Sequence, residues 1–215
     1  MTDRLNKIFN ELPICRVFAD IGCDHGYIAK AMISSGKCKN VIVSDISEKC
    51  LEKARQLLRR EIESGVATSV VSDGFDNVGE CDCALIAGMG GEEIVCILDK
   101  CKNLPETLVL QPMKNSDKVR LCAVKLGYEV LKDFTFKSAS KFYNLIILSR
   151  GLDSLTDEEI EFGRTNLRER PSAFKEELQS RIKKLTEYAG RSDVSEKTRL
   201  EMLKNAERLV KYVED

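Results

Sequence analysis

Short apolar runs alternate with longer amphipathic segments through the first two thirds of the chain. The runs have the length of strands, and apolar residues in the segments between them recur at helical spacing. Strands are predicted at residues 17–21, 41–46, 68–71, 83–87 and 107–110, and helices at 3–12, 27–35, 48–64, 92–102 and 116–126. We expect a helix after each of these five runs, which implies parallel strands with right-handed crossovers and helices on both faces.

The pattern changes after residue 127. Two strand-like runs, residues 129–136 and 142–148, are separated only by a short polar loop. Such a pair forms an antiparallel hairpin, here placed at the edge of the sheet. The prediction is therefore an α/β, Rossmann-like sheet of seven strands with the last strand reversed, an ending that dinucleotide dehydrogenases usually lack.

From about residue 152 the sequence becomes charged and helical. Thr156 and Glu159 have the spacing of a capping box, and Gly163 and Pro171 interrupt the helix that starts there. Two further helices, 172–189 and 196–213, carry heptad-like apolar stripes: Phe174, Leu178, Ile182, Leu185 and Ala189, then Leu203, Ala206, Leu209 or Val210, and Val213. We expect a domain at 1–151 followed by a helical coiled-coil hairpin domain at 152–215, which either packs structurally or serves as a partner-binding arm.

Composition narrows the class of protein. The 215 residues are 43% apolar and 32% charged, with no apolar run near the ~18 residues that a membrane span needs. The N-terminus lacks the apolar region of a secretory signal. Nine cysteines, no Cys-x-x-Cys pair and a single histidine, His25, give no support for a zinc site. We expect a cytoplasmic monomer with reduced thiols, no metal and no membrane contact. The net charge of −1 means that nucleic-acid binding would depend on where charges face.

The stretch VFADIGCDHGY, residues 17–27, joins the first strand to a helix through a glycine-containing turn. In open α/β sheets ligands bind at the carboxyl ends of strands, where this turn lies. Asp20 and Asp24 disfavour a phosphate ligand, which needs backbone N–H groups without nearby anions. The turn favours a nucleoside ligand without phosphate, or else it is a tight turn with no ligand.

Acidic residues also end the next two strands. Asp45 can accept hydrogen bonds from ribose hydroxyls, Asp73 can reach an adenine edge, and Gly88 lets a ligand approach the backbone. Carboxylates at three strand ends suit a nucleoside with a cationic tail, as in S-adenosyl-L-methionine. NAD fits less well, because Asp24 stands where its Gly-x-Gly-x-x-Gly fingerprint has the second glycine.

Several stretches resemble the TrmK family, bacterial tRNA methyltransferases that modify N1 of adenine 22. They are ADIGCDHGYI at 19–28, IAGMGG at 86–91, LVLQP at 108–112, Arg120 in the following helix, and Tyr143. Asp24 and His25 match a family feature. The resemblance covers nearly the whole chain, because the family also has a helical coiled-coil domain after its methyltransferase fold.

The resemblance implies a class I methyltransferase that uses S-adenosyl-L-methionine and has tRNA as its partner. The residues expected to bind the cofactor are Asp20, Gly22, Gly26, Tyr27, Asp45, Ile46, Asp73, Gly74, Gly88 and Met89. The catalytic candidates are Asp24, His25, Gln111 and Tyr143. We predict that Asp24 accepts a hydrogen bond from the adenine amino group and offsets the charge of the methylated base. Alternatively, Asp24 caps the next helix and His25 makes a structural hydrogen bond.

Two residues depart from the family pattern. Met113 stands where the family has Asn after Gln-Pro, and Asp45 stands where it has Glu. Asn115 is a candidate to replace the missing amide. Three functions therefore stay open: a tRNA adenine-N1 methyltransferase, a methyltransferase on another RNA or a small molecule, and a non-catalytic binding module. For tRNA, the hairpin offers basic residues, namely Arg168, Arg170, Lys175, Arg181, Lys183 and Lys184, although interleaved acidic residues also fit a solvated surface.

Overall fold

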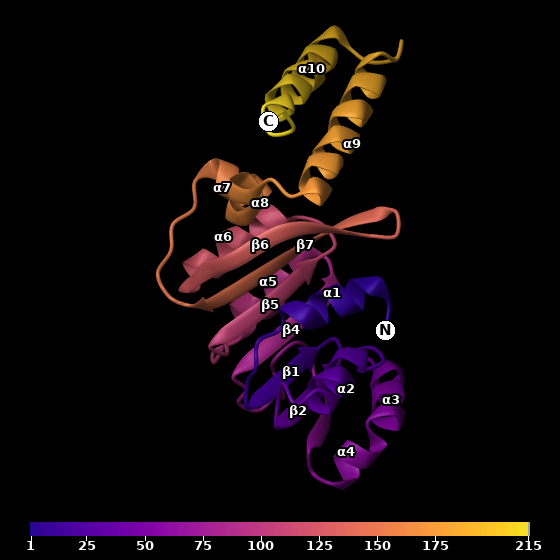
Figure 1. The fold of residues 1–215 in the computed structure, drawn as a ribbon, viewed down its shortest axis with the longest axis vertical. Helices are drawn as coiled ribbons and strands as arrows, with labels where there is room; N and C mark the ends of the chain where they lie inside the picture. Colours follow the sequence, from indigo (N-terminus) through magenta and orange to yellow (C-terminus); the bar gives the residue numbers. More distant parts are fainter. Residues whose placement is uncertain (215) are drawn as a thin grey trace.

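Seven strands form one mixed sheet in the computed structural model, which describes residues 1–214 (Figure 1). The strands are β1 (Val17–Ile21), β2 (Asn40–Asp45), β3 (Ala67–Val71), β4 (Cys83–Met89), β5 (Thr107–Pro112), β6 (Tyr128–Ser138) and β7 (Lys141–Arg150). Their order across the sheet is β3-β2-β1-β4-β5-β7-β6. Strands β1 to β5 are parallel, and β7 runs antiparallel between β5 and β6. The predicted seven-stranded sheet with a reversed last strand is confirmed.

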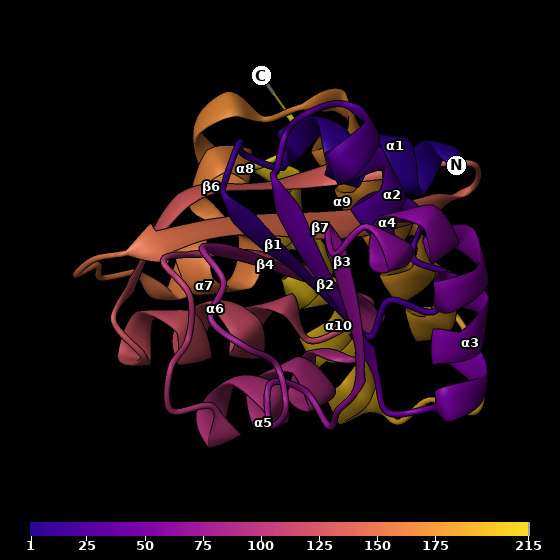
Figure 2. The same cartoon turned by 90° about the horizontal axis from the view of Figure 1, so that it is seen from below.

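Helices cover both faces of this sheet (Figure 2). They are α1 (Asp3–Glu11), α2 (Tyr27–Ser34), α3 (Glu48–Leu57), α4 (Arg59–Glu63), α5 (Gly91–Lys100), α6 (Ser116–Lys125), α7 (Asp157–Phe162), α8 (Arg164–Glu169), α9 (Ser172–Ala189) and α10 (Glu196–Val210). One core lies between the sheet and α1, α2 and α3, and includes Phe18, Met32 and Leu51. A second core lies under α5 and α6, with Ile21, Ile94 and Val119.

The sheet has a topological switch point at β1, where successive strands begin to be added on the opposite side. Strand β1 pairs with β2 on one side and with β4 on the other, so the first three strands build outward one way and β4 and β5 the other. In an open α/β sheet the crevice beyond the carboxyl ends of such neighbours is where ligands bind. The β1–α2 turn and the end of β4 lie at this place.

Two predictions about helices were wrong. The helix expected at 48–64 is broken at Leu58, whose backbone angles (φ −99°, ψ 15°) leave the helical range while its side chain is fully buried. The chain turns there, so that both helical segments keep their apolar residues against the sheet. No helix follows β3: among the described residues, 72–82 form turns, with Ser72 Oγ bonded to Gly74 O and to the Asn77 N–H.

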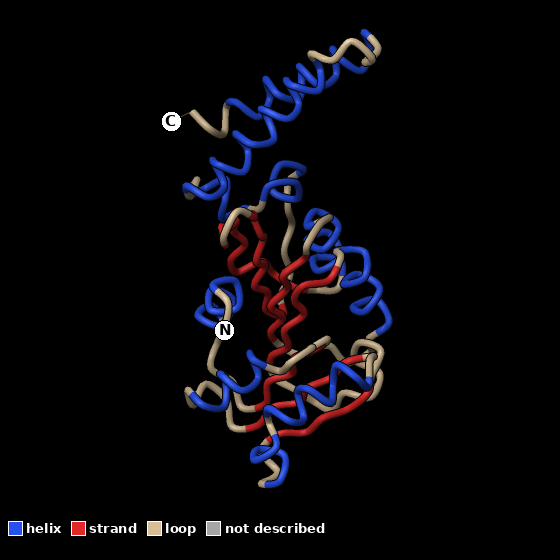
Figure 3. Tube along the Cα trace, turned by 90° about the vertical axis from the view of Figure 1, so that its right-hand side faces the viewer, coloured by secondary structure: helices blue, strands red, loops and turns tan. Residues whose placement is uncertain are grey.

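The C-terminal helices have a core of their own. The predicted capping box of Thr156 and Glu159 is present, and Gly163 separates α7 from α8. Helices α9 and α10 lie antiparallel and project beyond the β6 side of the sheet (Figures 1 and 3). Their shared core contains Phe162, Phe174, Leu178, Leu209 and Tyr212. Leu203, which was expected in the apolar stripe, is 43% exposed. Among residues 1–214, no helix combines the length and the apolar character needed to cross a membrane.

Candidate functional site

The β1–α2 turn is held over the ends of β1 and β2 by backbone bonds. The N–H groups of Gly22 and Cys23 both donate to Ser44 O, at 2.8 and 2.9 Å. Gly22, Asp24 and Gly26 all have positive φ, at 69°, 48° and 71°. Such angles are unfavourable for residues with a Cβ, although Asp tolerates them better than most. A Cβ on Gly22 would lie 2.0 Å from Met89 Cε, so the end of β4 packs directly against this turn.

Asp45 fixes the turn to the start of α3. One carboxylate oxygen accepts from the Asp24 N–H at 3.2 Å, and the other accepts from the Ser47 N–H at 2.8 Å. Each oxygen retains further acceptor capacity, so Asp45 can still bind hydroxyl groups. Next to it, Ile46 is 70% exposed. An exposed apolar side chain beside a carboxylate suits a ligand with a flat ring and hydroxyl groups.

Asp20 is a buried carboxyl at the end of β1. It is 5% exposed, and burial raises its pKa to about 7, with a backbone hydrogen bond from Ala29 opposing the rise and the Asp45 charge adding to it. Asp20 lines a cavity of about 160 Å³, which we call the turn cavity. Its lining residues are Arg4, Leu5, Asp20, Gly22, Cys23, Asp24, His25, Tyr27, Ile28, Leu85 and Ala87.

Asp24 and His25 lie at the mouth of the turn cavity and contact each other. Asp24 Oδ2 is 2.8 Å from His25 Nδ1, and Lys53 Nζ is 3.5 Å from Asp24 Oδ1. Although partial burial opposes it, these two partners lower the pKa of Asp24. The His25 ring stacks on Tyr27, with ring centroids 5.3 Å apart. The alternative that Asp24 caps α2 is wrong, because Gly26 is the N-cap and receives no side-chain bond.

Gln111 and Tyr143 meet through a residue that the sequence analysis missed. Arg4, on α1, donates from Nη1 to Gln111 Oε1 at 2.5 Å, and its guanidinium lies 5.8 Å from the centre of the Tyr143 ring. Gln111 is fully buried and also donates to Pro112 O at 3.0 Å. Arg4 lies 107 residues before Gln111, so no spacing in the sequence could have indicated the contact.

The remaining cofactor candidates lie outside the turn cavity. The Asp73 carboxylate is exposed and pairs with Lys100 Nζ at 3.2 Å. Gly74 has φ 59°, and a Cβ there would lie 2.7 Å from Ile97 Cγ2. Gly88, with φ 85°, lies close to the Arg4 guanidinium. The structure thus brings Asp20, Gly22, Asp24, His25 and Tyr27 together around one cavity. Of the other predicted cofactor residues, Gly26 belongs to the turn, Asp45 is bonded to it and Met89 packs against it. The remaining four lie at the ends of neighbouring strands: Ile46, Asp73, Gly74 and Gly88.

A larger cleft of about 640 Å³ opens beyond the end of β5, and we call it the β5 cleft. Its lining residues come from the end of β5, the β5–α6 connection, the start of α6, the β6–β7 hairpin, α7 and α9: Pro112, Met113, Lys114, Asn115, Ser116, Asp117, Thr135, Phe142, Tyr143, Asn144, Asp157, Ile160, Glu161, Phe162, Phe174, Glu177, Leu178 and Arg181. Met113 is 48% exposed, and its sulfur lies 3.6 Å from Gln111 Nε2. Tyr143 thus lines the β5 cleft and contacts Arg4 of the turn cavity, to which Gln111 also bonds.

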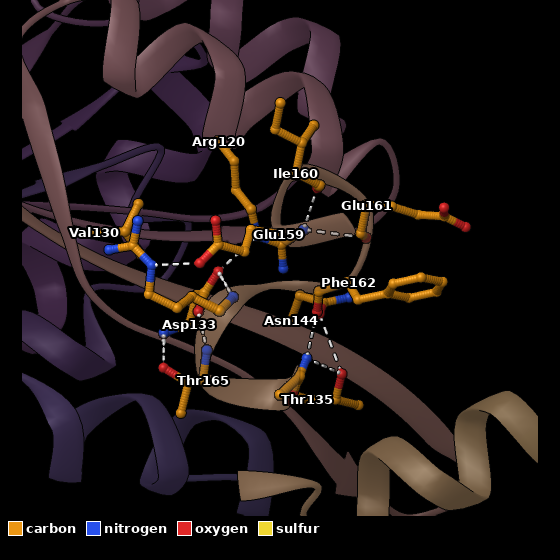
Figure 4. A network of polar contacts seen from close by, with 12 residues as sticks. Arg120, Val130, Asp133, Thr135, Asn144, Glu159, Ile160, Glu161, Phe162 and Thr165 are labelled. Carbon is orange, nitrogen blue, oxygen red and sulfur yellow. Dashed lines mark hydrogen bonds and ion pairs between the residues drawn. The ribbon is translucent and has the colours of Figure 1, made fainter. Parts of the chain in front are cut away.

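A buried polar network holds the far wall of the β5 cleft against the sheet (Figure 4). Arg120 Nε donates to Asp133 Oδ2 at 2.8 Å, and both side chains are fully buried. Arg120 Nη1 donates to Ile160 O at 3.0 Å, while the Thr165 N–H donates to Asp133 Oδ1 at 2.9 Å. These bonds join α6 and β6 to α7 and α8. Asp133 carried no sequence signal, since it stands alone in an edge strand.

Comparison with known proteins places the chain in a class. A family model described as a methyltransferase domain matches residues 1–146. The chain belongs to this methyltransferase-domain family.

Within that class the predicted resemblance to TrmK proteins is confirmed. The chain is 28% identical over 160 residues to the tRNA (adenine(22)-N(1))-methyltransferase of Bacillus subtilis, covering 70% of this chain and 66% of that protein. Its fold is similar to that of M. capricolum TrmK in complex with S-adenosyl-homocysteine, with TM-score 0.87, 23% identity and 99% and 97% of the two chains covered. For B. subtilis TrmK the TM-score is 0.83 at 22% identity, covering 100% and 99%. The matches span 54 to 66% of the length of the curated relatives.

Proposed function

We propose that this protein is a methyltransferase that uses S-adenosyl-L-methionine and methylates N1 of adenine 22 in tRNA. One observation carries the proposal. Arg4 lines the turn cavity, at the switch point of the sheet, and contacts both Gln111 and Tyr143, and Tyr143 lines the β5 cleft. A cofactor in the first and a nucleoside in the second would meet at these residues. The names of the relatives supply the substrate.

The donor set around the β1–α2 turn fits this cofactor. Asp45 can accept from the ribose hydroxyls, the exposed Ile46 side chain offers an apolar surface to the adenine ring, and Asp73 can accept from its amino group. The buried carboxyl of Asp20 suits the α-ammonium group. When bound, the cofactor supplies a methyl group on a sulfonium, which is an electrophile that requires no metal.

Adenine N1 has its own lone pair, so the protein needs to align the base and stabilise the positive charge that the base gains. Asp24 is suited to both tasks. Its lowered pKa keeps the carboxylate ionised at neutral pH, and His25 orients it through the 2.8 Å contact. The carboxylate can accept from the exocyclic amino group of adenine. Tyr143 is suited to form the other side of the base pocket, and the buried Gln111 supports it through Arg4.

An adenine within folded tRNA must leave its stack to reach this pocket, which costs a few kcal/mol. Contacts to the tRNA backbone have to offset that cost. Of the six basic candidates in the C-terminal helices, several have acidic partners nearby: Arg168 with Glu169, Arg181 with Glu161, and Lys183 with Glu187. Lys183 and Lys184 are exposed on α9 and offer positive charge to phosphates.

Met113 is the observation that favours a second class of substrate. This residue places a thioether, rather than an amide, at the entrance of the β5 cleft. Asn115 lines the same cleft and can supply an amide to the base. A methyltransferase acting on another RNA or a small molecule is the function to test if tRNA is not methylated.

The proposal is tested by transfer of labelled methyl from S-adenosyl-L-methionine to unmodified tRNA, followed by mapping of the modified nucleoside. We expect N1-methyladenosine at position 22 and no transfer to a matched tRNA with guanine there. Cofactor binding without any transfer to tRNA would contradict the substrate and leave the class intact. Absence of cofactor binding would contradict the proposal as a whole.

A further inference from the structure

Part of the wall of the β5 cleft has no role in the proposed methyl transfer. Strand β7 pairs with β5 only from Ile146 onward, so residues 142–144 lie beyond this paired part of β7 and line the cleft. Successive side chains of a strand point to opposite faces of the sheet. Tyr143 packs on the α1 side, so Asn144 points to the other face, on which α9 lies. We call that side of the cleft the inner wall; it contains Phe142, Asn144, Glu177 and Arg181.

One hydroxyl group orients two side chains of the inner wall. Thr135 Oγ1 lies 3.2 Å from Asn144 Oδ1 and 3.1 Å from Glu177 Oε2, and it accepts from Asn166 Nδ2 at 3.1 Å. A hydroxyl has a single hydrogen, so when Asn144 accepts it, Glu177 bonds to Thr135 by donating a proton of its own. Burial raises the pKa of Glu177, which favours this protonated form. Asn144 Nδ2 and Glu177 Oε1 then have no bonding partner among residues 1–214 and offer a donor beside an acceptor to the cleft.

The inner wall offers no free cation to a phosphate. Arg181 Nη2 lies 3.4 Å from Glu161 Oε1, and its guanidinium lies 5.8 Å from the centre of the Phe162 ring. The other basic lining residue, Lys114, belongs to the β5–α6 connection. Acidic residues outnumber basic ones among the residues that line the cleft, so this part of it favours an uncharged group over an anion.

The lining of the inner wall suits a flat polar ring. Phe142 is half-buried and stands two residues from Asn144, so both side chains lie on the same face of β7. The Phe142 ring can stack on a ligand whose edge bonds to Asn144 and Glu177. Proteins read unpaired RNA bases by this combination of stacking and hydrogen bonds to the base edge. The cleft, at about 640 Å³, is within the size range of pockets that enclose a whole small-molecule ligand.

We propose that the inner wall of the β5 cleft is a second base-binding site, which holds the base of a nucleotide next to the methylated adenine. The inference rests on the proposed RNA substrate. The base stacks on Phe142, accepts a hydrogen bond from Asn144 Nδ2 and donates one to Glu177 Oε1. Tyr143 and Asn144 then hold neighbouring bases on opposite faces of β7. Such a site makes recognition depend on the RNA beside the target, which a site for a single nucleoside does not.

The test measures the affinity of the full chain for three tRNAs by fluorescence titration: the unmodified tRNA, and the same tRNA without a base at the nucleotide before or after adenine 22. We expect one of the two abasic tRNAs to bind the wild type about 10-fold more weakly, as for the loss of one base–aromatic contact. Phe142→Ala should weaken binding of the intact tRNA by a similar factor and change binding of that abasic tRNA less than about 3-fold. Asn144→Ala should lose part of the discrimination, whereas Glu177→Gln, which keeps a neutral donor and acceptor, should retain it. Asn40→Ala is the matched control, since Asn40 is exposed at the start of β2 and should leave all three affinities unchanged.

Equal affinity of the wild type for all three tRNAs overturns the inference without any variant. An equal loss of affinity for all three tRNAs in Phe142→Ala also overturns it, because the side chain then does not contact a flanking base. Failure of the wild type to bind tRNA overturns the proposed substrate together with this inference. Methylation of adenine 22 without discrimination between the tRNAs overturns the inference alone, and discrimination without methylation overturns the proposed function alone, so the two are separable.

Discussion

Asp24 combines an unusual backbone conformation with an exposed, ionised side chain. Its φ of 48° is imposed by the turn, and the carboxylate is directed to His25 and Lys53 rather than to the helix start. Neither partner buries it, and the Asp24 side chain is 59% exposed, so its oxygens are open to a ligand.

Asp24→Asn tests the role of the carboxylate. Asn tolerates positive φ, so the turn should keep its shape, while one acceptor becomes a donor and the negative charge is lost. We expect kcat for tRNA methylation to fall about 100-fold, with cofactor affinity nearly unchanged. Lys53→Met, which removes the other partner of Asp24, is the control and should alter kcat little. Full turnover in Asp24→Asn would contradict the assigned role.

Asp20 makes the stability of the ligand-free protein depend on pH. Its pKa rises from an ordinary 3.8 to about 7 on folding, chiefly because the carboxyl is buried. Between these values the native state holds a proton that the unfolded state has lost, so the free energy of unfolding falls as pH rises through this range. Above pH 7 the ionised carboxyl is a constant cost, on the order of a few kcal/mol.

Thermal unfolding of Asp20→Asn checks this prediction. The variant cannot ionise, so its Tm should decline less than that of the wild type between pH 5 and 8. Asp76→Asn, a change of the same kind at an exposed position, should follow the wild type. Parallel curves for wild type and Asp20→Asn would show that the buried carboxyl does not titrate in this range.

At the scale of elements, one buried ion pair lies at the centre of the link between α6, β6 and the α7–α8 pair. Asp133 accepts bonds from Arg120 Nε and from the N–H groups of Arg164 and Thr165. Gly163 lets the chain come this close: a Cβ there would lie 2.8 Å from Asp133 Oδ2. This packing explains why the helix expected after Thr156 is interrupted at Gly163, where φ is 90°.

Removing one partner leaves the other charge buried. Asp133→Asn should lower the free energy of unfolding by about 3–5 kcal/mol, because Arg120 then lacks its counter-charge. The double variant Arg120→Met/Asp133→Leu should recover much of that loss, since it removes both charges and keeps apolar volume. Urea denaturation of the wild type, both single variants and the double variant measures the coupling. Additive losses in the double variant would show that the pair is not coupled.

At the scale of the whole molecule, the β5 cleft is lined by residues of the sheet and of α7 and α9, so the start of the helical hairpin forms part of its wall. The net charge of −1 gives no general attraction to RNA. The proposed binding of tRNA would then have to use local positive charge, and the hairpin presents Lys183 and Lys184 to solvent beside the cleft residue Arg181.

We expect the double variant Lys183→Glu/Lys184→Glu to bind tRNA more weakly. The slope of the logarithm of the tRNA association constant against the logarithm of the salt concentration should become less steep by about 1 to 2, as expected when one or two phosphate contacts are lost. Arg16→Glu/Lys39→Glu is the matched control: it changes the net charge equally at the amino ends of β1 and β2, opposite the site. Affinity measured by fluorescence over a range of salt gives both slopes. Equal effects of the two variants would mean that only net charge matters.

The sequence by itself determined most of the elements and their order. Hydrophobic periodicity and helix-breaking residues are local signals, so the seven strands, the reversed ending and the breaks at Gly163 and Pro171 followed from them. Strand ends could also be read, which is why Asp20 and Asp45 were placed at one edge of the sheet. The sequence did not determine the break at Leu58, because burial of that side chain against the sheet overrides the helical pattern around it.

Only the tertiary structure decided how distant residues combine into a site. Arg4 meets Gln111 and Tyr143 because α1 packs across the sheet, and Asp133 meets Arg120 because β6 lies next to α6 and α8. These contacts join residues that share no spacing or motif. Their energies depend on burial and on the absence of competing water, and both are set by the packing of whole elements rather than by local sequence.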